Sequence, residues 1–164
     1  MKSLKKYRFL IRFVIKVLTV FILVWAVITF VITPYRMSDN RMFPGVRDGD
    51  LGFFYQLDRA YVGDVILYKA GNGFHVGRVI ACGTQTVDFP EIGGYTVNGY
   101  VPFEEIPYET YGTDTLEYPM YVPENSVFVL NDFRSNTSDS RTYGVIPEEN
   151  IHGKLMFLLR RRNF

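Results

Sequence analysis

The chain has 164 residues, with 18 lysines and arginines against 17 aspartates and glutamates, a net charge of +1. This length accommodates about one domain, and the near-neutral charge excludes a generally basic nucleic-acid-binding protein. A single cysteine, Cys82, excludes an internal disulfide framework and a multi-cysteine metal site. Aromatic residues make up 16% of the chain, together with 14 glycines and 8 prolines, which favours a β protein rich in turns.

The charges are distributed unevenly along the chain. The first sixteen residues hold six basic residues and no acidic one, whereas the rest holds 12 basic and 17 acidic residues, a net charge of −5. An uncharged apolar run follows the basic segment from Val17 to Ile32. Extended to residues 13–33, the run would span about 30 Å as a helix, which is enough to cross a bilayer. We therefore predict a transmembrane signal anchor over 13–33 behind a basic segment over 1–12.

The basic flank predicts the orientation of this anchor. Positive charge collects on the cytoplasmic side of membrane helices, so we expect a single-pass protein of the plasma membrane, with a cytoplasmic N-terminus and residues 34–164 outside the cytoplasm. A cleaved secretory signal is the alternative. The apolar run is longer than such signals carry, and Thr33–Met37 offers no small-residue cleavage site, which favours an uncleaved anchor.

The rest of the chain consists of short apolar runs separated by turn residues, a pattern that predicts an antiparallel β-fold. Pro34 is expected to end the helix. Asn98-Gly99, between Tyr95–Val97 and Tyr100-Val101, is the strongest hairpin signal, because Asn-Gly tolerates the positive φ of a type I′ turn. No segment beyond residue 33 shows a helical period. The other expected strands are Leu51–Leu57, Val65–Tyr68, Phe74–Ala81, Ser126–Leu130 and Lys154–Arg160.

Three sequence blocks follow the apolar run. The first, over 35–50, contains Met42-Phe43-Pro44; the second comprises 62–68 and 75–80 and ends in Arg78-Val79-Ile80; the third is NDFRSNTSDSRTYG over 131–144. With the anchor, these blocks resemble a bacterial type I signal peptidase of the short, single-anchor Gram-positive kind. The resemblance covers essentially the whole chain. It implies a mainly β, signal-peptidase-like antiparallel domain outside the cytoplasm, with a substrate groove beside the membrane.

The catalytic residues of that family are absent from this chain. By the resemblance, a Ser/Lys dyad is expected, with the serine before Met-x-Pro and the lysine before Arg-Val-Ile. The corresponding positions hold Arg41 and Gly77. An arginine has no nucleophilic oxygen and stays protonated, and a glycine has no side chain, so neither can replace its counterpart. The resemblance therefore leads us to expect an inactive peptidase with no catalytic residue at these positions.

Catalysis by other residues near the two dyad positions is the alternative. Ser38 is the nearest hydroxyl to Arg41, and His75 lies two residues before Gly77 on the same strand face. A Ser38/His75 pair would make the chain an active serine endopeptidase that removes signal peptides, and a histidine base needs no depressed pKa. In the simpler interpretation, Ser38 is a turn hydroxyl and His75 is an aromatic ring on a β surface.

The resemblance also assigns structural roles. Asp139 and Arg141 should pair inside the domain and hold the third block against the strand of Gly77, and Thr137 stands where the family keeps a hydroxyl. The residues expected to support the fold are Arg78, Asp132, Arg134, Thr137, Asp139, Arg141 and Gly144. Those expected to line a groove for a substrate or partner are Arg41, Met42, Pro44, His75, Val76 and Gly77. The chain departs from the family's Asn, Gly and Thr at Phe133, Asn131 and Gly45.

Arg41 would place a fixed cation in that groove. It could contact a carboxylate or backbone carbonyls of a bound partner; the alternative is an ion pair with Asp39 or Asp132. Strand alternation would bury half of any apolar patch in the core, and basic termini attract anionic lipid. The surfaces that could contact lipid are Met42-Phe43, Phe53–Tyr55 and Arg160–Arg162.

Three functions fit these features. The first is a membrane-anchored pseudo-peptidase that holds secreted precursors or parts of an export assembly without cutting them. Dyad-lacking proteins of this family are associated with Gram-positive pilus assembly, so the resemblance adds a chaperone role toward pilin subunits, with sortases or other assembly proteins as partners. The second is the active peptidase with Ser38 and His75, and the third is a wall- or lipid-binding module. We expect no metal, cofactor or nucleic acid as ligand.

Overall fold

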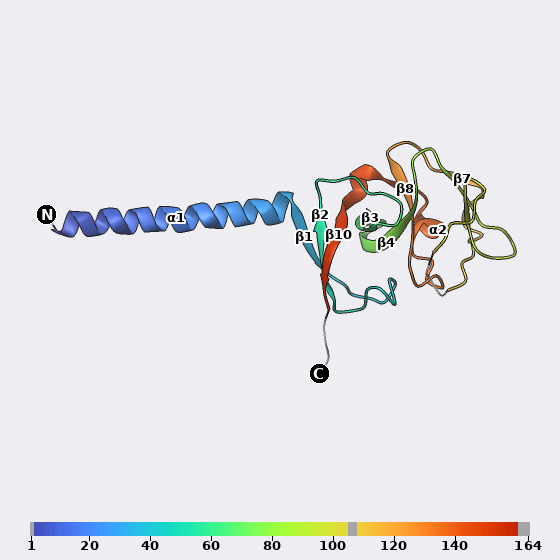
Figure 1. Cartoon of the computed structure of the whole chain (residues 1–164), viewed down its shortest axis with the longest axis horizontal. Coiled ribbons are helices and arrows are strands. Elements are labelled where there is room, and N and C mark those ends of the chain that lie inside the picture. Colours follow the sequence, from blue (N-terminus) through green and yellow to red (C-terminus); the bar gives the residue numbers. More distant parts are fainter. Residues whose placement is uncertain (1, 105–107, 161–164) are drawn as a thin grey trace.

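One long helix precedes a β domain and extends away from it (Figure 1). The structure, a computed structural model, describes residues 2–104 and 108–160. Helix α1 spans Lys2–Phe30, and its segment Tyr7–Phe30 has the length needed to cross a membrane and contains an 18-residue stretch with a mean hydropathy of 2.6. None of that segment is buried against the domain. A membrane anchor explains this uncovered apolar surface, while its orientation across the bilayer stays a prediction.

The end of the helix differs from the expected one. Helix α1 ends at Phe30 and not at Pro34, so the expectation that Pro34 terminates it is wrong. Pro34 lies instead within strand β1, Ile32–Arg36, which pairs antiparallel with β2, Leu51–Tyr55. Strand β1 is at the edge of its sheet, where a residue without an N–H group is tolerated. The domain therefore begins within two residues of the helix end.

A seven-stranded sheet forms the body of the domain, with antiparallel pairing and the order β1-β2-β10-β3-β4-β8-β9. The predicted mainly β fold is confirmed. In β8, Val129 packs on one face of the sheet and Phe128 on the other, so hydrophobic core lies on both faces of this strand. The remaining strands are β3 (Val65–Ala70), β4 (Gly73–Cys82), β8 (Ser126–Leu130), β9 (Ile146–Pro147) and β10 (Ile151–Leu159).

A second sheet of three short strands has the order β6-β5-β7. Strand β7 and its loops lie at the end of the domain away from α1 (Figure 1). Asn98 and Gly99 have the positive φ angles of 52° and 80° that the hairpin prediction required, and Val97 bridges Tyr100. Residues 100–101 form no strand, however, because β6 pairs with β5 instead. The three strands are β5 (Thr86–Asp88), β6 (Thr96–Val97) and β7 (Met120–Tyr121).

Two short helical turns follow residue 33, where no segment shows a helical period. They are α2, Ser140–Tyr143, and the 3₁₀ turn η1, Glu148–Asn150. The side chain of Asp139 caps α2 by accepting a hydrogen bond of 3.0 Å from the amide of Arg141, and Gly144 ends it with a φ of 75°. A single turn is too short to show a helical period, which explains why the sequence pattern missed both elements.

Candidate functional site

The two positions assigned to the missing dyad lie on different segments. Arg41 belongs to the loop between β1 and β2, and Gly77 to β4. The amide of Phe133 donates to the carbonyl of Arg41 at 2.9 Å, which attaches this loop to the third sequence block. Met42 is only 3% exposed and packs in the core, so the expectation that it faces lipid is wrong. The hydrogen bond from Phe133 and the burial of Met42 therefore fix the backbone at Arg41.

Arg41 forms an ion pair within its own loop. Its Nε and Nη2 each lie 2.7 Å from Oδ2 of Asp39, and its amide donates to Oδ1 of Asp39 at 3.0 Å. Of the two expected partners, Asp39 is the observed one. Asp132 instead accepts two hydrogen bonds from Arg78, at 2.8 and 2.7 Å. The charge of Arg41 is thus already balanced by a neighbouring carboxylate.

A second contact joins Arg41 to strand β4. Its Nη1 lies 2.6 Å from Nδ1 of His75. An arginine can only donate, so Nδ1 accepts, and the ring proton lies on Nε2, which donates to the carbonyl of Ala70 at 3.2 Å. The ring also stacks on Tyr68 and contacts Tyr143. Burial, and next the charge of Arg41, lower the pKa of His75, so the ring is held neutral.

We expect this histidine to make stability depend on pH. Because the pKa of His75 is lower in the folded chain than its ordinary value of about 6.5, the unfolded chain binds the proton more readily. The contribution of neutral His75 to the free energy of unfolding is complete above a pH of about 6.5 and is lost as the pH falls toward the pKa of the folded chain. On acidification in detergent, the thermal midpoint of full-length His75→Gln should therefore fall less than that of the unaltered protein. The Gln amide can still accept a hydrogen bond from Arg41. An equal fall in both proteins would contradict this.

The residues of the alternative catalytic pair lie around one small depression. Ser38 and His75 both line it, together with Met42 and Val76 of the expected groove, whereas Arg41, Pro44 and Gly77 do not. Both ring nitrogens of His75 already have partners, however, so the ring offers no free lone pair to receive a proton from Ser38. The relocated dyad stays a prediction, and it requires the Arg41 side chain to move first.

The space beside Gly77 is filled by other side chains. A Cβ atom at this position would collide with Cγ1 of Val129 and would lie 3.4 Å from both Cε1 of Tyr68 and the carbonyl oxygen of Leu130. Val129 and Tyr68 are fully buried. A lysine therefore cannot occupy position 77 until Val129 moves or is shortened. Sequence reasoning missed both neighbours, because only the pairing of β4 with β3 and β8 brings them to Gly77.

The hydroxyl of Tyr68 is buried with no hydrogen-bond partner among the residues that the structure describes. Burial, and then the charge of Asp139, raise its pKa, so the phenol stays protonated. An unsatisfied buried polar group costs about 1–3 kcal/mol. We expect Tyr68→Phe to raise the free energy of unfolding by about 1 kcal/mol, measured by chemical denaturation. Tyr95→Phe is the matched control and should destabilise, because the Tyr95 hydroxyl donates to Glu104.

The third sequence block is organised around one buried ion pair. Asp139 accepts from Nε and Nη2 of Arg141, at 3.0 and 2.8 Å, and from the amide of Asn131 at 2.9 Å. Arg141 also donates to the carbonyls of Arg134 and Asn136, at 2.9 and 2.8 Å. The expected pair between Asp139 and Arg141 is thus present in the structure. It satisfies the buried charges of both side chains.

The block contacts both β8 and β4, the strand of Gly77. Asp132 of the block binds Arg78 of β4, and the ring of Tyr143 contacts that of His75 on the same strand. The amide of Val129 donates to Oγ of Ser140 at 2.9 Å, and β8 lies between this contact and β4. Thr137 is exposed, and its carbonyl accepts from the amide of Asp139 at 2.8 Å. The side chain of Arg134 is fully buried and binds Glu104. These contacts hold the loop of the third block against the sheet.

The expected lipid-contact residues divide between core and surface. Phe54 is buried in the core, whereas Phe53 stacks on Phe157 at 4.4 Å between ring centroids. Nη2 of Arg160 donates to the carbonyl of Gly45 at 3.4 Å, while 161–162 lie outside the described residues. Lipid contact by the exposed members of this set stays a prediction.

The chain is similar to known proteins of one family. Residues 10–159 match the family described as signal peptidase, peptidase S26. The chain belongs to this family. Inactive signal peptidase IA of Staphylococcus aureus is 28% identical over 88% of each chain, and signal peptidase IB of the same species is 28% identical over 90% of this chain and 88% of that one. Probable signal peptidase I-1 of Synechocystis is 30% identical over 78% of this chain and 71% of that one.

A solved structure of an S26 relative confirms the fold. The crystal structure of signal peptidase I from Enterococcus faecalis aligns with a TM-score of 0.52 and 24% identity, over 62% of this chain and the whole of that one. The predicted signal-peptidase-like antiparallel β domain behind one apolar helix is therefore correct. S26 relatives include proteins named as peptidases and proteins named inactive, so membership of the family does not by itself establish activity.

Proposed function

We propose that this S26 family member is a membrane-anchored protein that has lost peptidase activity and holds secreted proteins without cutting them. The observation that carries the proposal is the repacked dyad region. Arg41 is bound to Asp39 and His75, and Val129 fills the space into which a side chain at position 77 would extend. No serine or lysine stands at either dyad position. The name of the staphylococcal relative, inactive signal peptidase IA, supports the same conclusion.

The retained scaffold supports a continuing role outside catalysis. Removing one partner of a buried ion pair is costly, and the pair of Asp139 with Arg141 remains complete although the dyad is gone. Arg78 likewise keeps both hydrogen bonds to Asp132. From the family resemblance we further propose that the secreted proteins are pilus subunits. The protein would act as their chaperone, with sortases as partners.

Photo-crosslinking in the producing bacterium tests this function. A photoreactive amino acid replaces Phe43, on the loop of Arg41, in the full-length protein, and adducts are identified by mass spectrometry. We expect adducts with exported proteins, surface subunits among them, and no shortened precursor. Adducts with lipid or wall polymer alone would overturn the proposal and favour the wall- or lipid-binding module. Deletion of the protein should also reduce the amount of assembled surface subunits, and the variant Arg41→Ala should restore it.

A further inference from the structure

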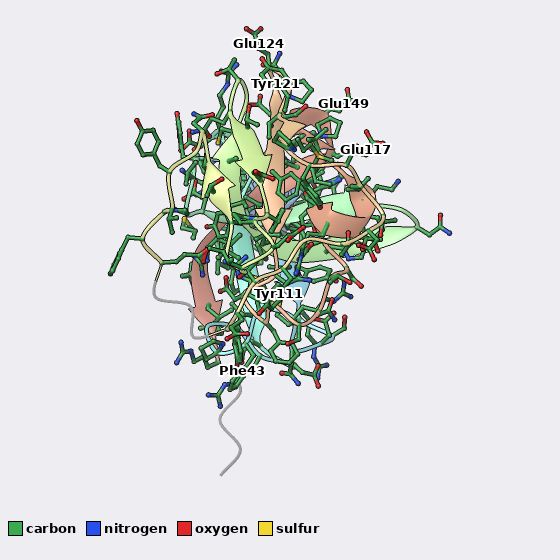
Figure 2. All side chains as sticks on the ribbon, turned by 90° about the vertical axis from the view of Figure 1, so that its right-hand side faces the viewer. Phe43, Tyr111, Glu117, Tyr121, Glu124 and Glu149 are labelled. Atoms are coloured by element: carbon green, nitrogen blue, oxygen red, sulfur yellow. The ribbon has the colours of Figure 1, made fainter. Side chains whose placement is uncertain are left out.

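A cavity of about 310 Å³ lies outside the dyad region, beside the small sheet. Figure 2 looks onto the end of the domain turned away from α1, and Tyr111 lies near the centre of that view. Among the described residues that line the cavity, three tyrosines and two glutamates carry polar side chains besides Thr110, and none is basic. The tyrosines and glutamates are Tyr95, Tyr108, Tyr111, Glu104 and Glu109.

The part of the chain around this cavity is strongly acidic. Residues 79–133 contain nine aspartates and glutamates and no lysine, arginine or histidine. Arg78 and Arg134, which flank this stretch, bind Asp132 and Glu104. Most of the remaining negative charge in the stretch has no basic neighbour in sequence, and Glu117 and Glu124 project from the same end of the domain (Figure 2). Such a field attracts cationic partners.

The two glutamates of the cavity differ in their surroundings. Glu104 accepts hydrogen bonds from the Tyr95 hydroxyl and, at 2.6 Å, from Nη2 of the buried Arg134, so its position and charge are both fixed. Glu109 is exposed and accepts only from the hydroxyl of Tyr111, at 2.9 Å, among the described residues. Glu109 also raises the pKa of Tyr111, which keeps the phenol protonated. The charge of Glu109 is therefore available to a ligand.

The rim of the cavity is apolar. Ile92 and Val101 line it and are 95% and 79% exposed, and the nearby Phe103 is 93% exposed. Aromatic faces attract ammonium and guanidinium groups, and a carboxylate binds them by charge-assisted hydrogen bonds. An apolar rim around a cation-binding site fits a ligand in which apolar groups flank the cation. A lysine or arginine between apolar residues of an extended polypeptide is such a ligand.

We propose that this cavity binds a lysine or arginine side chain of a partner protein, with apolar residues beside it. The proposal rests on the function given above, because it assigns the surface by which secreted proteins are held. The segments that line the cavity run through the part of the domain away from α1 (Figure 1), so a partner protein is a better source of the cation than lipid headgroups around the anchor. The depression lined by Ser38 and His75 holds only about 10 Å³, against about 310 Å³ for this cavity, so this cavity has room for a side chain and the depression does not.

Peptide binding to the full-length protein in lipid nanodiscs tests the site. Two fluorescent, end-blocked peptides share one sequence, with a central lysine in the first and acetyl-lysine in the second, each flanked by valine and serine. At low salt, the lysine peptide should bind about tenfold more tightly, as expected for a partly desolvated cation on aromatic rings. Added salt should reduce this preference. The variant Glu109→Gln/Tyr111→Leu should abolish it.

A matched variant separates the cavity from the acidity of the whole surface. Glu117→Gln/Tyr121→Leu removes the same charge and one tyrosine from the same end of the domain, but neither residue lines the cavity. It should keep the preference for lysine. Equal affinity for both peptides, or an equal loss in the two variants, would overturn the proposal. If crosslinks from position 43 to exported proteins persist without any lysine preference, this site is disproved while the proposed function stands.

Discussion

The triple variant Arg41→Ser/Gly77→Lys/Val129→Ala should cut a lipid-reconstituted preprotein about 100-fold faster than the double variant Arg41→Ser/Gly77→Lys, since misplacing a catalytic group by about 1 Å costs that much. The double variant restores both residue types of the dyad. It leaves Val129 in the space that the new lysine needs, because even a Cβ at position 77 collides with Cγ1 of Val129. Shortening Val129 removes the collision.

Burial is also what would make the lysine a base. A lysine can accept the proton of a serine only if its pKa is lowered toward neutrality, and desolvation lowers it. The neighbours of position 77 supply an apolar environment, since Tyr68 and Val129 are fully buried. A lysine that is pushed outward by Val129 would stay solvated and protonated. Activity of the triple variant should therefore rise with pH through the lowered pKa of that lysine.

The controls for this variant are direct. Product is measured by mass spectrometry of the released signal peptide, and Val129→Ala alone should give none. Folding of each variant is checked by its thermal midpoint. Equal rates for the double and triple variants would show that Val129 does not block the position, and the repacking that we infer around Gly77 would be wrong.

Asp139→Asn should lower the free energy of unfolding by about 3–5 kcal/mol, because it leaves Arg141 buried without its counter-charge. Both side chains are at most 1% exposed, and Asp139 also caps α2 and accepts from the amide of Asn131. Chemical denaturation of the full-length protein in detergent measures this loss. The double variant Asp139→Asn/Arg141→Leu should be less destabilised than the single one, since no unpaired charge remains in it.

A surface ion pair provides the matched control. Asp39→Asn removes the partner of Arg41, but the Asp39 side chain is 41% exposed, so the cost should be below about 1 kcal/mol. Equal losses for Asp39→Asn and Asp139→Asn would contradict the structural role that we assign to the buried pair.

The sequence predicted those features that depend on local pattern. The apolar run predicted the membrane-spanning part of α1, and short apolar runs between turn residues predicted β2, β3, β4, β8 and β10. The family's motifs beside each position located Arg41 and Gly77. Strands β5 and β7 have only three and two residues, too few to show a period. The helix end was misplaced because pairing of β1 with β2 draws residues 32 and 33, at the end of the apolar run, into the sheet.

The surroundings of the site depended on tertiary contacts and could not be predicted from the sequence. The sequence left Asp39 and Asp132 as alternative ion-pair partners of Arg41. In the structure Asp132 pairs with Arg78 of β4, and Arg41 pairs with Asp39. The engagement of both ring nitrogens of His75, and the approach of Val129 to Gly77, also arise only when the strands are assembled. The acidity of residues 79–133 is visible in the sequence, but the cavity within it is not.

Cleavage of a preprotein by the unaltered full-length protein tests our central conclusion most directly. The protein is reconstituted in lipid with the preprotein, beside Ser38→Ala as the control for the displaced nucleophile. We expect the preprotein to stay intact with both proteins, because Arg41 replaces the serine and His75 is engaged by Arg41 and Ala70. Product from the unaltered protein that disappears in Ser38→Ala would contradict this conclusion and establish an active peptidase with a relocated nucleophile.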